Sequence, residues 1–174
     1  MSDVVRVGVV SFRCFDLFFL LFVNIIRRIE MKHIVGFTGT QSGMVPEQKR
    51  QFKEILQIFH PITEFHPGDC IGADSDAHQI VHEQEIPIVL HPPTNKTKRA
   101  FCLTSTIIKE LSPKSYLERN QDIVDACSVL IATPEGDCEE IRSGTWATIR
   151  RARKAGKPIY IIWPDGDLEI EYEK

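Results

Sequence analysis

Strand-like and helix-like hydrophobic patterns alternate along the chain from residue 31 onward. Short runs rich in Val, Ile and Phe predict buried strands, at 33–38, 62–66, 86–91, 128–133 and 158–163. Apolar positions at helical spacing predict amphipathic helices between them, at 46–60, 72–84, 116–127 and 143–155. Strands separated by helices favour a parallel sheet with right-handed crossovers. We therefore predict an α/β fold, a Rossmann-like three-layer sandwich with a mainly parallel five-stranded sheet.

Two stretches of the chain show neither the strand-like nor the helix-like hydrophobic pattern. Residues 92–113 form a long, mostly polar connection, and loops of that length within a compact domain are usually functional or mobile. Residues 166–174 are acidic and predict a tail. The predicted Rossmann-like domain spans 31–165, and the tail follows it.

Residues 1–30 form a hydrophobic N-terminal extension whose composition differs from the rest. Five of the ten Phe lie in it, whereas all ten Pro and all six His come later. Its longest uninterrupted apolar run covers 17–23, which is shorter than the ~20 residues of a membrane-spanning helix. We expect the extension to lie upstream of a natural start at Met31. An amphipathic peripheral helix and a packed element or oligomer contact are the alternatives.

Composition and charge narrow the function classes. Apolar residues make up 43% and charged residues 26% of the chain, which is typical of a globular protein. The formal net charge of -3 argues against a strongly basic nucleic-acid binder. The five Cys include no CxxC pair and indicate reduced thiols in a cytoplasmic protein. We predict no metal site and no resident cofactor.

The candidate chemistry lies in three loops that each follow a strand. Ligands of parallel sheets bind at the carboxyl ends of the strands, so we expect these loops to converge. The first loop reads GFTGTQSGM at 36–44, where glycines let the backbone approach a ligand closely. It has neither the GxGxxG nor the P-loop spacing. Its predicted ligand-binding residues are Gly39, Thr40 and Gln41.

The second loop reads HPGDCIGAD at 66–74 and opens a helix. Asp69 and Asp74 can accept hydrogen bonds from ribose hydroxyls. Asp74 can equally stabilise the helix N-terminus through the helix dipole. Gly72 and Ala73 stand beside Asp74 and are predicted to contact the ligand with it.

The third loop leads into Arg142, Ser143, Gly144 and Thr145 at the start of a helix. Backbone N–H groups and hydroxyls gather there, where the helix dipole is positive, and this predicts a phosphate site. An ordinary serine N-cap is the alternative. Polar residues near other strand ends and helix starts complete the predicted ligand-binding set: His91, Arg99, Arg119 and Asn120.

These motifs together resemble the SLOG superfamily over residues 31–165. The resembling stretches are GFTGT at 36–40, GDCIGAD at 68–74, the RN pair at 119–120 and SGT at 143–145. The superfamily includes DNA-processing proteins, LOG-type phosphoribohydrolases and small nucleotide sensors. The resemblance implies a Rossmann-like domain that holds a phosphate on 143–145 opposite Gly39 and Thr40, with Asp74 on the ribose side. It also implies a homo-oligomer.

One departure from the superfamily concerns catalysis. LOG-type enzymes carry a catalytic Glu soon after a Gly-Gly-x-Gly-Thr motif, whereas residues 142–148 read RSGTWAT. We therefore expect a protein that binds a nucleotide or nucleotide-derived molecule, as a sensor or by sequestration.

Two alternatives remain open for the function. The first is a hydrolase or transferase that cleaves an N-glycosidic bond, with Asp69, Asp74 and Glu135 as candidate carboxylates. The second is single-stranded DNA binding. The expected partner is a nucleotide-type small molecule, with neither a nucleic acid nor a membrane span.

Overall fold

The computed structural model describes residues 33–172, so the expectations about residues 1–30 lie outside the described part. Its strands are β1 (His33–Gly39), β2 (Ile62–His66), β3 (Ile88–Leu90), β4 (Ile107–Glu110), β5 (Val129–Thr133), β6 (Ile159–Ile162) and β7 (Leu168–Glu171). Its helices are α2 (Pro46–Ile58), α3 (Ala73–Glu83), α4 (Tyr116–Ala126) and α5 (Gly144–Lys154), with a 3-10 turn η1 (Lys96–Lys98). Within 33–172, no helix is long and apolar enough to cross a membrane.

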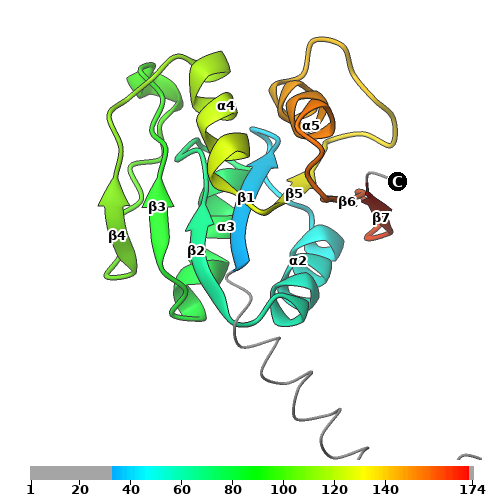
Figure 1. Ribbon diagram of the computed structural model, residues 1–174, viewed down its shortest axis with the longest axis horizontal. Coiled ribbons are helices and arrows are strands. Elements are labelled where there is room, and N and C mark those ends of the chain that lie inside the picture. The colour runs from blue at the N-terminus through cyan, green and yellow to red at the C-terminus, as the bar shows by residue number, and fades with distance from the viewer. Residues whose placement is uncertain (1–32, 173–174) are drawn as a thin grey trace, which may run out of the picture. The chain divides into compact units, whose positions relative to one another are not determined.

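The strands form one sheet in the order β4-β3-β2-β1-β5-β6-β7, with β4 and β7 at its two edges (Figure 1). All neighbours pair in parallel except β6 and β7, which are antiparallel. The chain proceeds outward from β1 to β4 and then returns to place β5 on the other side of β1. The strand order therefore switches between β1 and β5, where ligands of such sheets bind.

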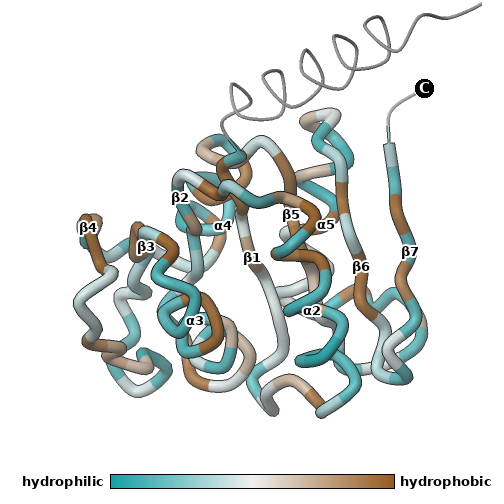
Figure 2. The backbone as a smooth tube through the Cα atoms, turned by 90° about the horizontal axis from the view of Figure 1, so that it is seen from below, coloured by the Kyte–Doolittle hydropathy of each residue, from teal (hydrophilic) through white to brown (hydrophobic). Residues whose placement is uncertain are grey.

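Helices cover both faces of the sheet and enclose two apolar cores. On one face, α2 and α3 pack on the strands around Phe37 and Phe52, whose ring centroids are 5.3 Å apart. On the other face, α4 and α5 pack around Trp146. Alternate β5 residues enter the two cores, Ile131 the first and Leu130 the second. The helices show both hydrophilic and hydrophobic segments in Figure 2. The predicted three-layer α/β fold is confirmed.

The number of strands exceeds the five predicted because the sheet gains an edge strand on each side. β4 lies within the expected connection 92–113, and only its first residue, Ile107, packs against the core. β7 lies within the expected tail 166–174 and pairs with β6. Its two glutamates are held by neighbours, Glu169 by Trp163 and Glu171 by Arg153. Edge strands that are short and charged carry almost none of the hydrophobic signal by which a strand is predicted.

Candidate functional site

A cavity of about 490 Å³ opens at the carboxyl ends of the strands, beside the switch between β1 and β5. Its volume lies within the ~300–1,000 Å³ of typical small-molecule sites. The loops after β1, β2 and β5 contribute to its walls, together with the first turns of α4 and α5. The predicted residues that line it are Gly39, Thr40, Gln41, Asp74, Arg119, Asn120, Glu135, Arg142, Ser143, Gly144 and Thr145. The three loops therefore converge as predicted.

The N-terminus of α5 forms one wall of this cavity. Ser143 caps the helix, because its Oγ accepts a hydrogen bond from the Trp146 amide at 3.4 Å. The amides of Gly144 and Thr145 belong to the first turn, whose N–H groups have no acceptor within the helix. The first turn of α5 carries no acidic side chain. This end of the helix therefore presents partial positive charge to the cavity.

Gly144 leaves open space on that wall. A Cβ atom built on this glycine would have no heavy atom of the protein within 4 Å. Its φ is not positive, so the backbone does not require glycine. The missing side chain is therefore explained neither by packing nor by conformation.

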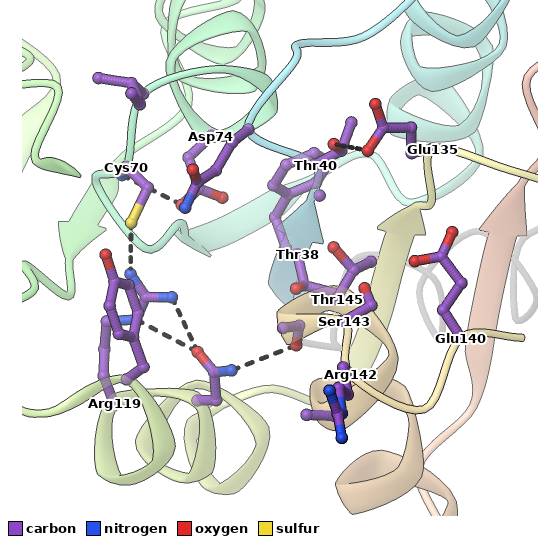
Figure 3. A pocket seen from close by; sticks show the side chains of 18 of the residues that line it. Thr38, Thr40, Cys70, Asp74, Arg119, Glu135, Glu140, Arg142, Ser143 and Thr145 are labelled. Carbon is purple, nitrogen blue, oxygen red and sulfur yellow. Dashed lines mark hydrogen bonds between the residues drawn. The ribbon is translucent and has the colours of Figure 1, made fainter.

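Arg119 stabilises the wall of the cavity that lies opposite the start of α5 (Figure 3). Its buried guanidinium donates hydrogen bonds to the Gly68 carbonyl, the Cys70 sulfur and the Asn120 side-chain oxygen, each at 2.8 Å. Asn120 Nδ2 in turn donates to the Gly144 carbonyl at 3.4 Å. Arg119 and Asn120 thus connect the loop after β2 to the start of α5.

Asp74 and Cys70 lie next to Arg119 on the same wall. The Asp74 carboxylate is buried and accepts a hydrogen bond from the Cys70 amide at 3.1 Å. Burial raises the pKa of Asp74, although the charge of Arg119 opposes this shift. Burial, followed by the nearby Asp74 carboxylate, raises the pKa of the Cys70 thiol to about 11. Cys70 is therefore a neutral thiol at neutral pH and a poor nucleophile.

Glu135 supplies an exposed carboxylate at the rim of the cavity. Thr40 Oγ1 donates to one of its oxygens at 3.2 Å, and Ser42 Oγ donates to the other at 3.0 Å. The two hydroxyls fix the orientation of the carboxylate. Thr40 and Glu135 face each other in Figure 3.

Gly72 and Ala73, which are predicted to contact the ligand, are not among the residues that line this cavity. Gly72 has a φ of +92°, and a Cβ on it would come within 2.3 Å of the Gln41 carbonyl oxygen. The Ala73 amide donates to the Thr40 carbonyl at 2.9 Å. These residues therefore shape the site by holding the loop after β1.

Asp69 and Arg99 also lie outside the lining. The Asp69 carboxylate is fully buried, forms an ion pair with Arg99 and accepts the Cys102 amide at 3.2 Å. Arg99 also donates to Glu110 at 2.8 Å. The pair fastens the connection between β3 and β4, so Arg99 is not available to close over an anion.

His91 lies in a second cavity, between β2, β3, β4 and α4. Its Nε2 is 2.8 Å from Nδ1 of His66, and Nε2 of His66 is 3.0 Å from Glu64. Burial lowers the pKa of both imidazoles, that of His91 to about 4. The prediction that His91 contacts the same ligand as the other residues is therefore not supported by its position.

Several lining residues were missed by the sequence analysis: Phe37, Thr38, Cys70, Ile71, Tyr116, Leu117, Glu140 and Ala147. The helical spacing could have predicted Tyr116 as a lining residue. Residues three apart lie on the same helix face, and Arg119, three residues later, is a predicted site residue. Among residues 33–172, no group of three His, Cys, Asp or Glu side chains is placed to hold a metal ion.

The fold and the position of the cavity define a Rossmann-like α/β domain with a pocket at its switch point. No family model matches the sequence, and no curated protein matches it either. Similarity appears among solved structures, at 15–19% sequence identity.

Three of these structures illustrate the likeness. The molybdenum cofactor binding protein of Rippkaea orientalis is 19% identical, with 77% of this chain and 78% of that chain covered at a TM-score of 0.59. The molybdenum cofactor carrier protein of Chlamydomonas reinhardtii is 18% identical, with 75% and 76% covered at 0.54. DNA processing protein A of Streptococcus pneumoniae is 15% identical, with 78% and 52% covered at 0.56.

All of these neighbours are under 25% identical, so the likeness shows the fold alone, and this is the Rossmann-like fold that the resemblance of the sequence implies. The chain spans about half the length of the S. pneumoniae protein.

Proposed function

We propose that the cavity binds a small phosphate-bearing molecule of the nucleotide type, with its phosphate at the N-terminus of α5. The observation that carries the proposal is the open space at Gly144. Glycine weakens a helix relative to alanine, and here neither packing nor φ calls for it. A phosphate oxygen that approaches the amides of Gly144 and Thr145 needs that space.

The helix end that faces the cavity supports a compact anion as the ligand. The chain as a whole is acidic, with a formal net charge of -3, so its overall field does not attract polyanions. The lining also carries the carboxylates of Asp74, Glu135 and Glu140 beside the guanidinium groups of Arg119 and Arg142, so the local group that would attract an anion is the positive end of α5. The neutral thiol of Cys70 argues for binding without covalent chemistry on sulfur. A sensor or a sequestering protein fits this combination.

Calorimetry of Gly144→Ala tests the proposal. The probes are the four nucleoside 5′-monophosphates, NAD and ribose 5-phosphate. The added methyl group should weaken the tightest of these ligands more than tenfold while the unfolding free energy changes by less than ~1 kcal/mol. Gly136→Ala is the matched control, because a Cβ there meets Glu140 at an ordinary 3.6 Å, and residue 136 does not line the cavity.

Two results would refute the phosphate placement. One is unchanged affinity in Gly144→Ala and in the double variant Ser143→Ala with Thr145→Ala. The other is the absence of binding to every probe by the unmodified chain.

Cleavage of an N-glycosidic bond is a second candidate function, because Glu135 is a carboxylate oriented by Thr40 and Ser42 at the cavity rim. Such reactions pass through an oxocarbenium-like state that a carboxylate stabilises. Incubation with nucleoside 5′-monophosphates and NAD should then release free base, and Glu135→Gln should abolish the release. Recovery of intact nucleotide after prolonged incubation would exclude this candidate.

A further inference from the structure

Two large apolar side chains project into solvent from the connection between β3 and β4. Phe101 is 51% exposed and Leu103 is 87% exposed, and neither lines either of the two cavities described above. Three basic residues precede them closely in the sequence, and we call residues 96–103 the basic apolar loop. Exposed apolar side chains that gather beside cations mark a surface at which a partner can dock.

The backbone of this loop holds Phe101 in a conformation that is unfavourable for an aromatic residue. Its φ of +54° lies in the left-handed region that favours glycine. Such a conformation persists only where the surrounding structure fixes it. The ring is not buried in return, and it lies against Arg99, whose Cζ atom is 4.7 Å from the ring centroid. Packing within the chain therefore does not explain an aromatic side chain at this position.

Hydrogen bonds fasten the loop to the rest of the domain on both sides of Phe101. The Ala100 amide donates to the Asp69 carbonyl at 2.8 Å, and the Cys102 amide donates to the Asp69 carboxylate at 3.2 Å. Thr104 Oγ1 lies 2.9 Å from Nε2 of the buried His78 on α3. The apolar side chains are thus presented on a fixed backbone, which loses little conformational freedom when a partner binds.

The charge of this part of the chain is opposite to that of the whole protein. The formal net charge is -3, but residues 86–109 contain no Asp or Glu. Their basic residues are Lys96, Lys98, Arg99 and Lys109. Two carboxylates already pair with Arg99. Within residues 33–172, Lys96 and Lys98 form no ion pair, so their charges remain for an anionic partner.

The chemistry of the two apolar side chains distinguishes between anionic partners. The bases of a single-stranded nucleic acid stack on aromatic rings, which Leu103 does not offer. A lipid surface accepts both kinds of side chain, because Phe and Leu enter the boundary between headgroups and acyl chains while basic residues remain among the headgroups. The pairing of an exposed leucine with Phe101 and two unpaired lysines therefore favours lipid.

We propose that the basic apolar loop docks the protein on the surface of an anionic lipid membrane. Phe101 and Leu103 enter the headgroup boundary, and Lys96 and Lys98 contact the anionic headgroups. The loop lies on the surface and does not span the bilayer. This site is separate from the cavity at the strand ends, so it does not depend on which ligand that cavity holds.

Sedimentation of the 174-residue chain with lipid vesicles tests the proposal. The chain should sediment with vesicles of phosphatidylcholine and phosphatidylserine, and much less with phosphatidylcholine alone. The double variant Phe101→Asn with Leu103→Ser should lower the partition coefficient about tenfold or more. Asn adopts positive φ more readily than Phe, so this variant should remain folded, which its melting temperature verifies.

Ile141→Ser is the matched control for the loss of an exposed apolar side chain. Ile141 is 88% exposed but follows an acidic run between β5 and α5. The acidic residues of that run are Glu135, Asp137, Glu139 and Glu140. An anionic surface repels them, so Ile141→Ser should leave sedimentation unchanged.

Tryptophan fluorescence reports on the loop itself, separately from any other segment that contacts lipid. Phe101→Trp should shift its emission to shorter wavelength when phosphatidylserine vesicles are added, because the indole leaves water. Ile141→Trp should show no such shift. The two native tryptophans are common to both variants and cancel in the comparison.

Three results would overturn the proposal. The first is the absence of sedimentation with phosphatidylserine vesicles. The second is equal sedimentation of the unmodified chain and the double variant, together with an unshifted emission of Phe101→Trp. The third is binding of a thymidine oligonucleotide that the double variant loses while vesicle sedimentation stays unchanged, which would assign the loop to nucleic acid instead.

Discussion

Two helices begin at the same edge of the sheet after a glycine-containing loop, and the surroundings of their first turns are opposite. At the start of α3, a Cβ on Gly72 would lie 2.3 Å from the Gln41 carbonyl oxygen, and the Ala73 amide is already bonded to Thr40. At the start of α5, a Cβ on Gly144 would meet nothing within 4 Å. The comparison shows two different roles of a glycine before or at a helix start. Gly72 allows two backbone segments to pack closely, whereas Gly144 leaves open space beside the helix.

Charge distinguishes the two helix starts in the same way. The first turn of α3 carries Asp74 and Asp76, and Asp76 accepts hydrogen bonds from the Met44 amide at 2.8 Å and from Lys49 at 2.7 Å. The first turn of α5 has no acidic residue. The positive end of α3 is thus already compensated by the protein's own carboxylates, whereas no carboxylate in the first turn of α5 compensates its positive end.

The largest effect is expected from Gly72→Ala. The new methyl group would collide with the backbone at Gln41 and would occupy a φ of +92°, so the unfolding free energy should fall by about 3 kcal/mol or more. Urea denaturation measures the loss. Gly166→Ala is the control, because its φ of +89° is similar but its nearest neighbour is the Glu47 side chain at 3.2 Å. Equal losses in the two variants would show that the contact with Gln41 contributes nothing.

A smaller effect, which depends on pH, is expected from Asp74→Asn. Burial raises the pKa of Asp74 above its ordinary value of 3.8. As the pH rises above 3.8, the unfolded chain therefore loses this proton before the folded one does, and deprotonation favours unfolding. The stability of the unmodified chain should fall relative to that of Asp74→Asn over this range. Urea midpoints between about pH 4 and 7 measure it, and a pH-independent difference would contradict the assignment.

The smallest effect on folding is expected from Ser143→Ala, which removes the N-cap of α5 and should cost about 1 kcal/mol. Ser115→Ala, at the N-cap of α4, should cost a similar amount. Only Ser143 lines the cavity, so only Ser143→Ala should also weaken binding of nucleoside 5′-monophosphates in calorimetry. Equal effects of both serines on binding would remove the distinction between a cap and a ligand site.

The convergence of the site could be predicted because it follows from topology. Parallel strands end at one edge of a sheet, so Thr40, Asp74 and Ser143 had to lie near one another once the strands were recognised. Buried strands such as β5 carry a continuous apolar signal. The short edge strands β4 and β7 carry charged residues and little of that signal, so the strand count was too low.

The particular partners of polar residues could not be predicted. Asp69 and Arg99 are both predicted to contact the ligand, but they form an ion pair with each other. The two residues lie far apart in the sequence, so no local pattern could predict this pairing. His91 likewise turns to His66 and not to the cavity. The sequence alone does not distinguish Gly72 from Gly144. Only the positions of neighbouring atoms show that a side chain would collide at residue 72 and would find open space at residue 144.

The walls of the cavity have a thermodynamic consequence because they come from four distant stretches of the chain. Thr40, Asp74, Arg119 and Ser143 meet only when the crossovers of the sheet are complete. Unfolding therefore destroys the site, and a ligand bound only by the folded chain stabilises it by about 2.7 kcal/mol at a free concentration of 100 times its Kd. Melting temperature is thus a direct readout of occupancy, and a thermal scan against a collection of metabolites can identify the ligand without any assay of activity.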